Sequence, residues 1–268
     1  MNCPICNSSV TKVVFEYSSP PKGEVRFRFS GGQEYIREVL QCEICGHYIS
    51  SFRIDTTDLY SGNYVQANYA DSTGIRKTFE RIISLDPSRS DNYGRVRAIV
   101  EFARTLWLEE NVSGTILDVG SGLGVFPCAM KKAGWDCTAI DPDRSAADHI
   151  RENIGVKAIM GDFMTTDLDG HYDAISFNKV LEHVEDPVTM LSRARKNLAL
   201  RGFIYVEVPD GEMAERDGKG REEFFIDHLH VFSFVSTALM AKKAGFTPLR
   251  IMRLQEPSTK YTIRAFLV

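Results

Sequence analysis

The stretch from Thr115 to Pro127, with the sequence TILDVGSGLGVFP, constrains the fold more than any other part of the chain. An apolar run, Ile116–Val119, ends in glycines at positions 120, 122 and 124, and apolar residues then recur at helical spacing. Glycine has no Cβ, so it lets the backbone turn tightly and lets a ligand lie against it. A strand, a glycine turn and a helix in this order are typical of the first unit of a nucleotide-binding α/β sheet.

After this unit, strand-like and helix-like stretches alternate along the chain. Apolar runs end near Asp141, Gly161, Asn178 and Val208, and stretches with helical spacing lie between most of them. This alternation predicts a mainly parallel sheet with helices on both faces, a doubly wound α/β fold. The last two strand-like stretches are joined by a short connection around Pro257, so we expect them to pair antiparallel.

Ligands of open α/β sheets bind beyond the carboxyl ends of the strands, so the residues that follow each strand are the candidates for binding. After the second strand of this domain, Asp141 can accept hydrogen bonds from both hydroxyls of a ribose. A helix N-cap is the alternative role for this aspartate. Asp143 is available as the cap, however, which favours the ribose for Asp141.

The N-terminal part carries two C-x-x-C pairs. They are Cys3 with Cys6 and Cys42 with Cys45. Each pair has the spacing of a knuckle that presents two thiolates to one tetrahedral zinc, and strand-like stretches lie between the pairs. We therefore expect residues 1–54 to form a small β-rich module around a structural Zn²⁺. A redox C-x-x-C motif is the alternative, which the second matched pair disfavours.

Residues 55–110 are expected to form a helical connector or lid between this module and the main domain, residues 111–268. Tyrosine and turn residues are frequent in 55–91, and such a segment packs against the next domain or covers a ligand. Helical spacing follows the N-cap candidates Ser90-Asp91 and leads directly into the first strand of the main domain.

The spacing of the glycine turn distinguishes two classes of nucleotide-binding sheet. A dinucleotide fingerprint needs a third glycine where this chain has Val125, and Gly124 comes one residue early. The pattern D-x-G-x-G-x-G that begins at Asp118 resembles the first motif of class I S-adenosylmethionine-dependent methyltransferases. This resemblance implies S-adenosylmethionine as cofactor and a seven-stranded Rossmann-like sheet with its last strand antiparallel. A structural turn in another kind of α/β protein is the alternative.

The resemblance also implies which residues bind the cofactor. In that family the glycine turn receives the methionine tail and the ribose, and the acid after the third strand accepts from the adenine amino group while its neighbour packs on the ring. The corresponding positions here are Asp118, Gly120, Ser121, Gly122, Gly124, Asp141, Asp162, Phe163 and Asn178. A solvated turn is the alternative for Asp162.

Two later segments bear on the acceptor of the methyl group. The stretch Leu181–Pro187 resembles the family's L-x-H-x-x-D-P sequence. The stretch Asp227–Ser233 resembles the E/D-H-x-x-x-F-S segment of methyltransferases that act on sugars and other small metabolites, including sugar C-methyltransferases. Those enzymes also carry two N-terminal C-x-x-C zinc pairs and continue into another α/β domain that is not part of this sequence.

In those enzymes the histidine of this segment is a base. The resemblance therefore implies His228 as the general base, with His230 as the fallback and His183 as the next choice. Histidine suits this role because its unperturbed pKa lets it accept a proton near neutral pH. A structural role is the alternative for each of these histidines.

Composition restricts the partners and the compartment. The 268 residues carry a net charge of −4, and residues 1–50 show no basic-aromatic stripe, so a nucleic-acid partner is disfavoured. No apolar run approaches the length of a membrane span, and Met1–Pro4 does not resemble a signal peptide. Six cysteines in such a chain indicate metal or free thiols, and we expect a cytoplasmic protein.

Together these features predict an S-adenosylmethionine-dependent methyltransferase with a zinc module. The expected acceptor is a small polar metabolite related to sugars, such as a nucleotide sugar or a glycan precursor. An RNA methyltransferase with a zinc ribbon and a non-catalytic cofactor-binding protein are the alternatives. The sequence leaves open the oligomeric state and whether oxygen, nitrogen or carbon is methylated.

Overall fold

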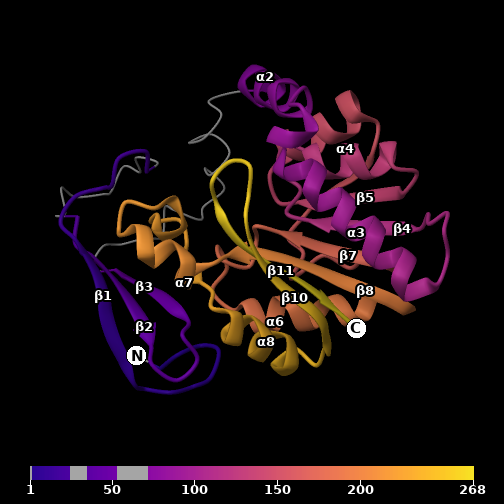
Figure 1. Ribbon diagram of the computed structural model, residues 1–268. Helices are drawn as coiled ribbons and strands as arrows, with labels where there is room; N and C mark the ends of the chain where they lie inside the picture. Colours follow the sequence, from indigo (N-terminus) through magenta and orange to yellow (C-terminus); the bar gives the residue numbers. More distant parts are fainter. Residues whose placement is uncertain (1, 25–34, 53–71) are drawn as a thin grey trace.

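The computed structural model describes residues 2–24, 35–52 and 72–268, which form two β-sheets with helices around the larger one (Figure 1). Most of the tyrosine-rich part of the expected connector, residues 55–71, lies outside the described residues. Among the described residues, no helix combines the length and the apolar character needed to cross a bilayer.

The smaller sheet is antiparallel and combines strands from both ends of the chain. In sheet order its strands are β1 (Thr11–Tyr17), β2 (Arg37–Cys42), β3 (Tyr48–Phe52) and β9 (His230–Val231). In β3, Tyr48 pairs with Val231 and Ile49 pairs with His230. The N-terminal module is thus completed by a strand from the main domain, which the sequence did not predict.

The larger sheet has seven strands, in the order β10-β11-β8-β7-β4-β5-β6. Their bounds are β4 (Thr115–Val119), β5 (Asp136–Asp141), β6 (Lys157–Met160), β7 (Tyr172–Asn178), β8 (Leu198–Pro209), β10 (Pro248–Gln255) and β11 (Tyr261–Leu267). The final strand, β11, is antiparallel to both of its neighbours, and the pairs among β4 to β8 are parallel. The predicted seven-stranded sheet with a reversed last strand is confirmed.

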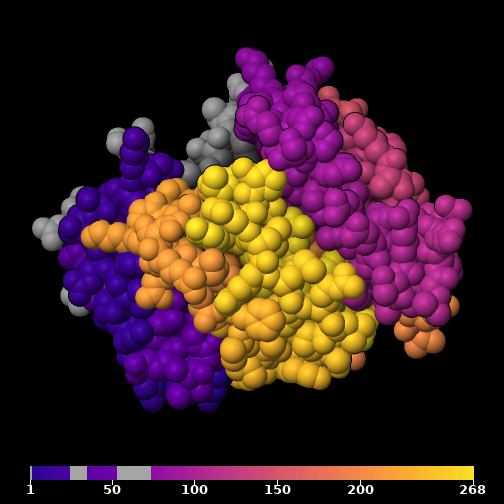
Figure 2. All heavy atoms as spheres, in the orientation of Figure 1, coloured from indigo at the N-terminus to yellow at the C-terminus, as the bar shows by residue number. Residues whose placement is uncertain are grey.

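Helices cover both faces of the larger sheet, with α3 and α4 on one side and α6 and α8 on the other (Figure 1). The helices are α2 (Ser72–Ile83), α3 (Asp91–Trp107), α4 (Val125–Lys132), α5 (Arg144–His149), α6 (Pro187–Arg193), α7 (Gly211–Ala214) and α8 (Phe234–Lys243). Figure 2 shows the residues that follow β8, in orange, between the N-terminal module and the yellow β10–β11 hairpin.

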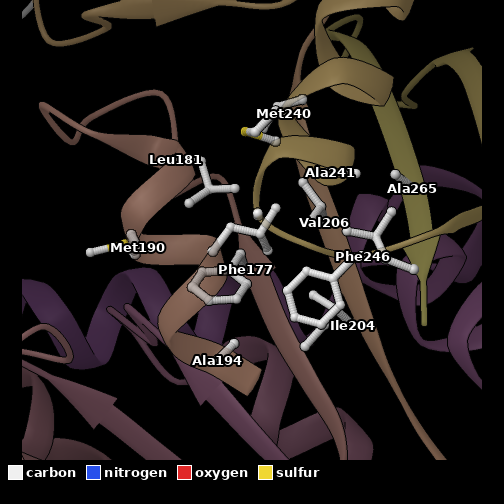
Figure 3. Close-up of a cluster of buried hydrophobic side chains, with 14 of the residues drawn as sticks. Phe177, Leu181, Met190, Ala194, Ile204, Val206, Met240, Ala241, Phe246 and Ala265 are labelled. Atoms are coloured by element: carbon white, nitrogen blue, oxygen red, sulfur yellow. The ribbon is translucent and has the colours of Figure 1, made fainter. Parts of the chain in front are cut away.

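Each face of the larger sheet has its own core, because successive residues of a strand point to opposite faces. Ile116 lies in the core that contains side chains of α3 and α4, and Leu117 lies in the core that contains side chains of α6 and α8. Figure 3 shows part of the second core, where Phe177 and Val206 lie with Met240 of α8. These two apolar faces account for the predicted helices on both sides.

A buried ionic network ties α3 to the middle of the sheet. Glu207 of β8 accepts hydrogen bonds from Arg95 of α3, from Nε of Arg264 at 3.2 Å and from the Tyr205 hydroxyl at 2.7 Å. Arg264 also donates to Glu256 at 2.6 Å. Burial alone would raise the pKa of Glu207, but the guanidinium groups outweigh it and hold the pKa of this carboxyl well below its usual range.

Replacing Glu207 by glutamine should lower the free energy of unfolding at pH 7 by about 3–5 kcal/mol, because it leaves buried guanidinium charge unpaired. The pKa is lower in the folded than in the unfolded protein. The stabilisation is therefore fully present above about pH 4.3 and is lost as pH falls towards the folded value. Urea unfolding at pH 7 and at acidic pH measures this difference.

The matched control is Glu101→Gln, which removes a carboxylate from the solvent face of α3. Glu101 pairs with Arg97 at 3.0 Å, but these side chains are 51% and 68% exposed, so the loss should stay below about 1 kcal/mol. Equal losses in the two variants would contradict the role assigned to Glu207.

Candidate functional site

The carboxyl ends of β4, β5 and β7 meet where the strand order changes direction, and the glycine turn follows β4 at this edge. Gly122 and Gly124 have φ angles of +49° and +68°. A Cβ on Gly124 would lie 2.5 Å from Ile154, whereas a Cβ on Gly122 would meet no atom within 4 Å. Packing therefore requires Gly124, and Gly122 presents open backbone at the edge of the sheet.

Asp141 links the end of β5 to this open glycine. One carboxylate oxygen accepts from the backbone N–H of Gly122 at 2.8 Å, and the other accepts from that of Asp143 at 2.9 Å. Asp143 itself accepts from the Ala146 N–H, so it is the N-cap of α5. Burial raises the pKa of Asp141. Each of its oxygens has a second acceptor position, so the carboxylate can still receive hydroxyl donors.

Asp118 is buried below the turn and holds its neighbours in place. Its Oδ1 accepts from the Ser176 hydroxyl and from the Asn178 amide, each at 2.7 Å. Burial raises the pKa of Asp118 to about 6. Ser121 donates to the backbone carbonyl of Asp118 at 2.9 Å. The amide oxygen of Asn178 is buried and has no donor among the described residues.

The two residues expected at the adenine lie in different surroundings. Asp162 is exposed after β6 and accepts from the backbone N–H of Met164 at 2.8 Å. Phe163 is only 3% exposed, and its ring packs edge-on against Phe177 with centroids 5.7 Å apart. The expected contact between the Phe163 ring and adenine is therefore corrected, because this side chain is enclosed by the core of the sheet.

The segment before β9 brings His228 next to His183, with ring centroids 4.9 Å apart. The backbone N–H groups of Leu229 and His230 both donate to the carbonyl of Glu182, at 2.8 and 3.1 Å. Since Glu182 follows β7, these bonds hold the histidine segment over the carboxyl end of that strand. The structure therefore brings together two of the three histidines proposed for catalysis.

His230 lies apart from that pair and is buried. Its Nδ1 is 3.1 Å from Nε2 of His47, and its Nε2 is 3.4 Å from the carbonyl oxygen of Glu185. Burial lowers the pKa of His230 to about 4. The fallback assignment of His230 as base is corrected, because both of its ring nitrogens face protein groups.

Two residues beside these histidines were not predicted from the sequence as site residues. His47 is fully buried and packs against His230, with ring centroids 5.2 Å apart. Glu182 is also fully buried, next to His183 in the chain. A carboxylate directly before His183 was the available signal for Glu182, whereas nothing local indicates the long-range partner of His47.

The four N-terminal cysteines converge as the two C-x-x-C pairs predict, with their sulfur atoms all within 4.8 Å of one another. Sγ of Cys3 lies 3.6 Å from that of Cys45, and Sγ of Cys6 lies 3.4 Å from that of Cys42. These distances exclude disulfides, in which the sulfurs are about 2.05 Å apart. Four thiolates around one zinc at about 2.3 Å would lie about 3.8 Å apart, so this donor set fits the metal.

Comparison with known proteins places the chain in a family. Residues 89–251 match the family model described as a methyltransferase domain. The chain is 28% identical over 164 residues to the ubiquinone biosynthesis O-methyltransferase of Caulobacter vibrioides, over 58% of this chain and 64% of the relative. The chain thus spans less than two thirds of the length of that relative.

Solved structures share the fold at low sequence identity. The 1,6-didemethyltoxoflavin-N1-methyltransferase of Burkholderia thailandensis, with bound 1,6-didemethyltoxoflavin and S-adenosylhomocysteine, has a TM-score of 0.57 at 15% identity, over 90% of this chain and 97% of that one. The magnesium protoporphyrin IX methyltransferase of Synechocystis PCC 6803, with bound S-adenosylhomocysteine, also has a TM-score of 0.57 at 15% identity, over 75% and 96%.

The family model covers more than half of the chain, and its residues span the glycine turn, the acidic strand ends and the histidine segment. The solved structures share the overall fold of this chain. This chain belongs to the methyltransferase-domain family.

Proposed function

We propose that this chain transfers a methyl group from S-adenosylmethionine to a small polar molecule. The observation that carries the proposal is the open backbone at Gly122 beside the buried carboxylate of Asp141. The buried amide oxygen of Asn178, which has no donor among the described residues, supplies an acceptor for an ammonium group. Ribose hydroxyls and an amino-acid ammonium group are the donors that S-adenosylmethionine offers, so the residues fit this cofactor.

Each residue at this edge has a role in the proposal. When bound, S-adenosylmethionine supplies a methyl group on a positively charged sulfur, which keeps the electron pair of the broken carbon–sulfur bond. Asp141 would accept from the ribose hydroxyls, and Asp162 would accept from the adenine amino group. Gly122 would admit the ligand to the backbone, whereas a Cβ on Gly120 would lie 2.8 Å from Val180, so packing requires Gly120. Asp118 would orient Asn178. Two solved relatives with this fold contain S-adenosylhomocysteine, which supports this cofactor.

For the acceptor we propose a metabolite related to sugars. The resemblance of Asp227–Ser233 and the paired cysteines to sugar methyltransferases supports this class. Two of the similar proteins are named for ubiquinone biosynthesis and for 1,6-didemethyltoxoflavin. These names also favour a small-molecule acceptor over a nucleic-acid acceptor. The polar groups of Glu182, His183 and His228 beside the sheet edge suit an acceptor with hydroxyl groups.

We propose that His228 promotes loss of the acceptor's proton. Its Nδ1 lies 2.7 Å from the backbone carbonyl oxygen of Glu223. A carbonyl oxygen can only accept, so Nδ1 carries the ring proton and Nε2 is left with a lone pair. As the acceptor atom forms its bond to the methyl carbon, its proton passes to this lone pair. Alignment of the acceptor supplies the rest of the rate enhancement.

Replacing Asp141 by alanine should weaken binding of S-adenosylmethionine by about 1–3 kcal/mol, because a two-point contact with the ribose is lost. Isothermal titration calorimetry measures this change. Asp136→Ala is the matched control, since Asp136 is exposed at the opposite end of the same strand. Binding of NAD in place of S-adenosylmethionine would contradict the proposed cofactor.

We also propose that Cys3, Cys6, Cys42 and Cys45 hold one structural zinc. Cys42→Ser should remove a zinc ion that wild-type protein retains through dialysis, and it should destabilise the N-terminal module. Elemental analysis and thermal unfolding measure these effects. Cys128→Ser, which alters a buried cysteine of α4, is the control and should keep the zinc. A folded module without metal in the wild-type protein would contradict the proposal.

Replacing His228 by asparagine should reduce turnover about 10²–10⁴-fold, the usual cost of losing a group that assists proton transfer. Affinity for S-adenosylmethionine should stay nearly unchanged, because other residues bind the cofactor. Release of S-adenosylhomocysteine with a panel of sugar nucleotides, related metabolites and RNA provides the assay. The control is His171→Asn, since His171 is exposed just before the amino end of β7.

Turnover of the His228→Asn variant within about threefold of wild type would remove His228 from the reaction. A parallel loss of cofactor affinity would assign it to structure. Methylation of RNA alone within the panel would overturn the proposed acceptor class.

A further inference from the structure

We infer that Glu182, His183 and His228 bind one divalent metal cation, at a site that shares no residue with the four cysteines. One ligand atom from each of the three residues lies within 4.8 Å of the others. Glu182 and His183 come from the loop after β7, and His228 comes from the segment before β9. The backbone hydrogen bonds between Glu182 and Leu229 hold these two parts of the chain together.

The carboxylate of Glu182 is the first reason for the inference. The residue is fully buried, and neither carboxylate oxygen has a hydrogen-bond donor among the described residues. A buried carboxylate without a donor or a counter-charge is costly, so native proteins pair such groups or use them as metal ligands. The backbone carbonyl of Glu182 already accepts two N–H groups, so the unsatisfied part of this residue is its charged end.

The orientation of the two histidines is the second reason. Nδ1 of His183 lies 2.7 Å from the backbone carbonyl oxygen of Asp227, and Nδ1 of His228 lies 2.7 Å from that of Glu223. Each Nδ1 must therefore carry the ring proton, and each Nε2 in the neutral ring has a lone pair. Donation of the second ring N–H to a carbonyl is the usual arrangement of histidines that ligate metals, because it fixes the tautomer and the ring.

The group thus consists of three electron-pair donors without a positive charge among them. Two imidazoles and one carboxylate are a common ligand set for divalent transition-metal ions, which keep further positions open. Ligands about 2.1 Å from a metal lie about 3.4 Å apart at the tetrahedral angle, so the side chains need to close by about an ångström. Both histidines are only partly buried, which leaves room for this movement and for a further ligand.

The cation would take part in the proposed methyl transfer. Its chemical role rests on that proposed function, whereas its binding does not. An acceptor hydroxyl bound at an open position would lose its proton more readily, because a divalent cation stabilises the resulting oxyanion. The proton goes to solvent, and the oxygen then forms its bond to the methyl carbon. With the cation bound, the Nε2 lone pair of His228 is a metal ligand, so the cation promotes the deprotonation that His228 would perform in its absence.

Binding of Mn²⁺ to the zinc-loaded, full-length protein tests the inference without cofactor or acceptor. Thiolates prefer zinc, whereas carboxylate and imidazole ligands accept Mn²⁺, so the probe separates the two sites. Electron paramagnetic resonance distinguishes free from bound Mn²⁺, and we expect one bound ion per chain. Mn²⁺ should also raise the midpoint of thermal unfolding as its concentration increases.

Glu182→Gln and His228→Asn should each weaken Mn²⁺ binding at least tenfold. Loss of a hydrogen-bond partner of a metal ligand already lowers metal affinity about 10–100-fold, and here a ligand itself is lost. Without Mn²⁺, Glu182→Gln should be at least as stable as wild type, since it removes an unpaired buried charge. Glu185→Gln is the matched control, an exposed carboxylate in the same loop, and it should bind Mn²⁺ as wild type does. His228→Asn, at a partly exposed position, gives an independent result if Glu182→Gln folds poorly.

Absence of Mn²⁺ binding up to about 1 mM in the wild-type protein would overturn the inference. So would equal weakening in Glu185→Gln and Glu182→Gln, or unchanged binding in His228→Asn. Calorimetric titration with S-adenosylmethionine on the same samples keeps the two proposals apart. Cofactor binding without Mn²⁺ binding contradicts only the metal site, whereas Mn²⁺ binding without cofactor binding contradicts only the proposed methyl transfer.

Discussion

The pairing of β3 with β9 is the contact on which the proposed binding site for the methyl acceptor depends. Beyond the two residue pairs of these strands, the backbone N–H of Ser50 donates to the carbonyl of Leu229 at 3.0 Å, and its hydroxyl donates to that of His228 at 2.6 Å. The N-terminal module therefore fixes the backbone of the histidine that we place at the acceptor. The cysteines lie in the same apolar cluster as Met240 of α8, so the N-terminal module packs against the main domain.

The polar residues at the sheet edge divide into two kinds. Some hold the structure together through their hydrogen bonds, such as Asp118 with its two side-chain donors and Glu207 with its guanidinium partners. Others have acceptor atoms that the described residues leave without a hydrogen-bond donor, such as Asn178 and Glu182. Because unsatisfied buried acceptors are costly, the second kind marks where ligands are expected. Asn178 and Glu182 are four positions apart, at the end of β7 and in the loop that follows, so the proposed sites for cofactor and acceptor are neighbours in the chain.

Features that depend on neighbouring residues could be predicted from the sequence. The glycine turn, the helix cap at Ser90 and the reversed last strand all follow from local spacing and turn chemistry, and the structure has them. The features that were missed depend on contacts between distant parts of the chain. His47 meets His230 only after the small sheet has formed, and Phe163 is enclosed only after α6 packs on the larger sheet. A sequence pattern carries no information on such contacts.

The central claim is that the edge of the larger sheet and the segment around His228 form one site. A crystal structure of the protein with S-adenosylhomocysteine tests this most directly. In this complex we expect the ribose hydroxyls to contact Asp141, the amino group to contact Asn178 and the sulfur to face the side on which His228 lies. A ligand bound away from the glycine turn, or a sulfur directed away from His228, would show that the sheet edge and the His228 segment do not form one site.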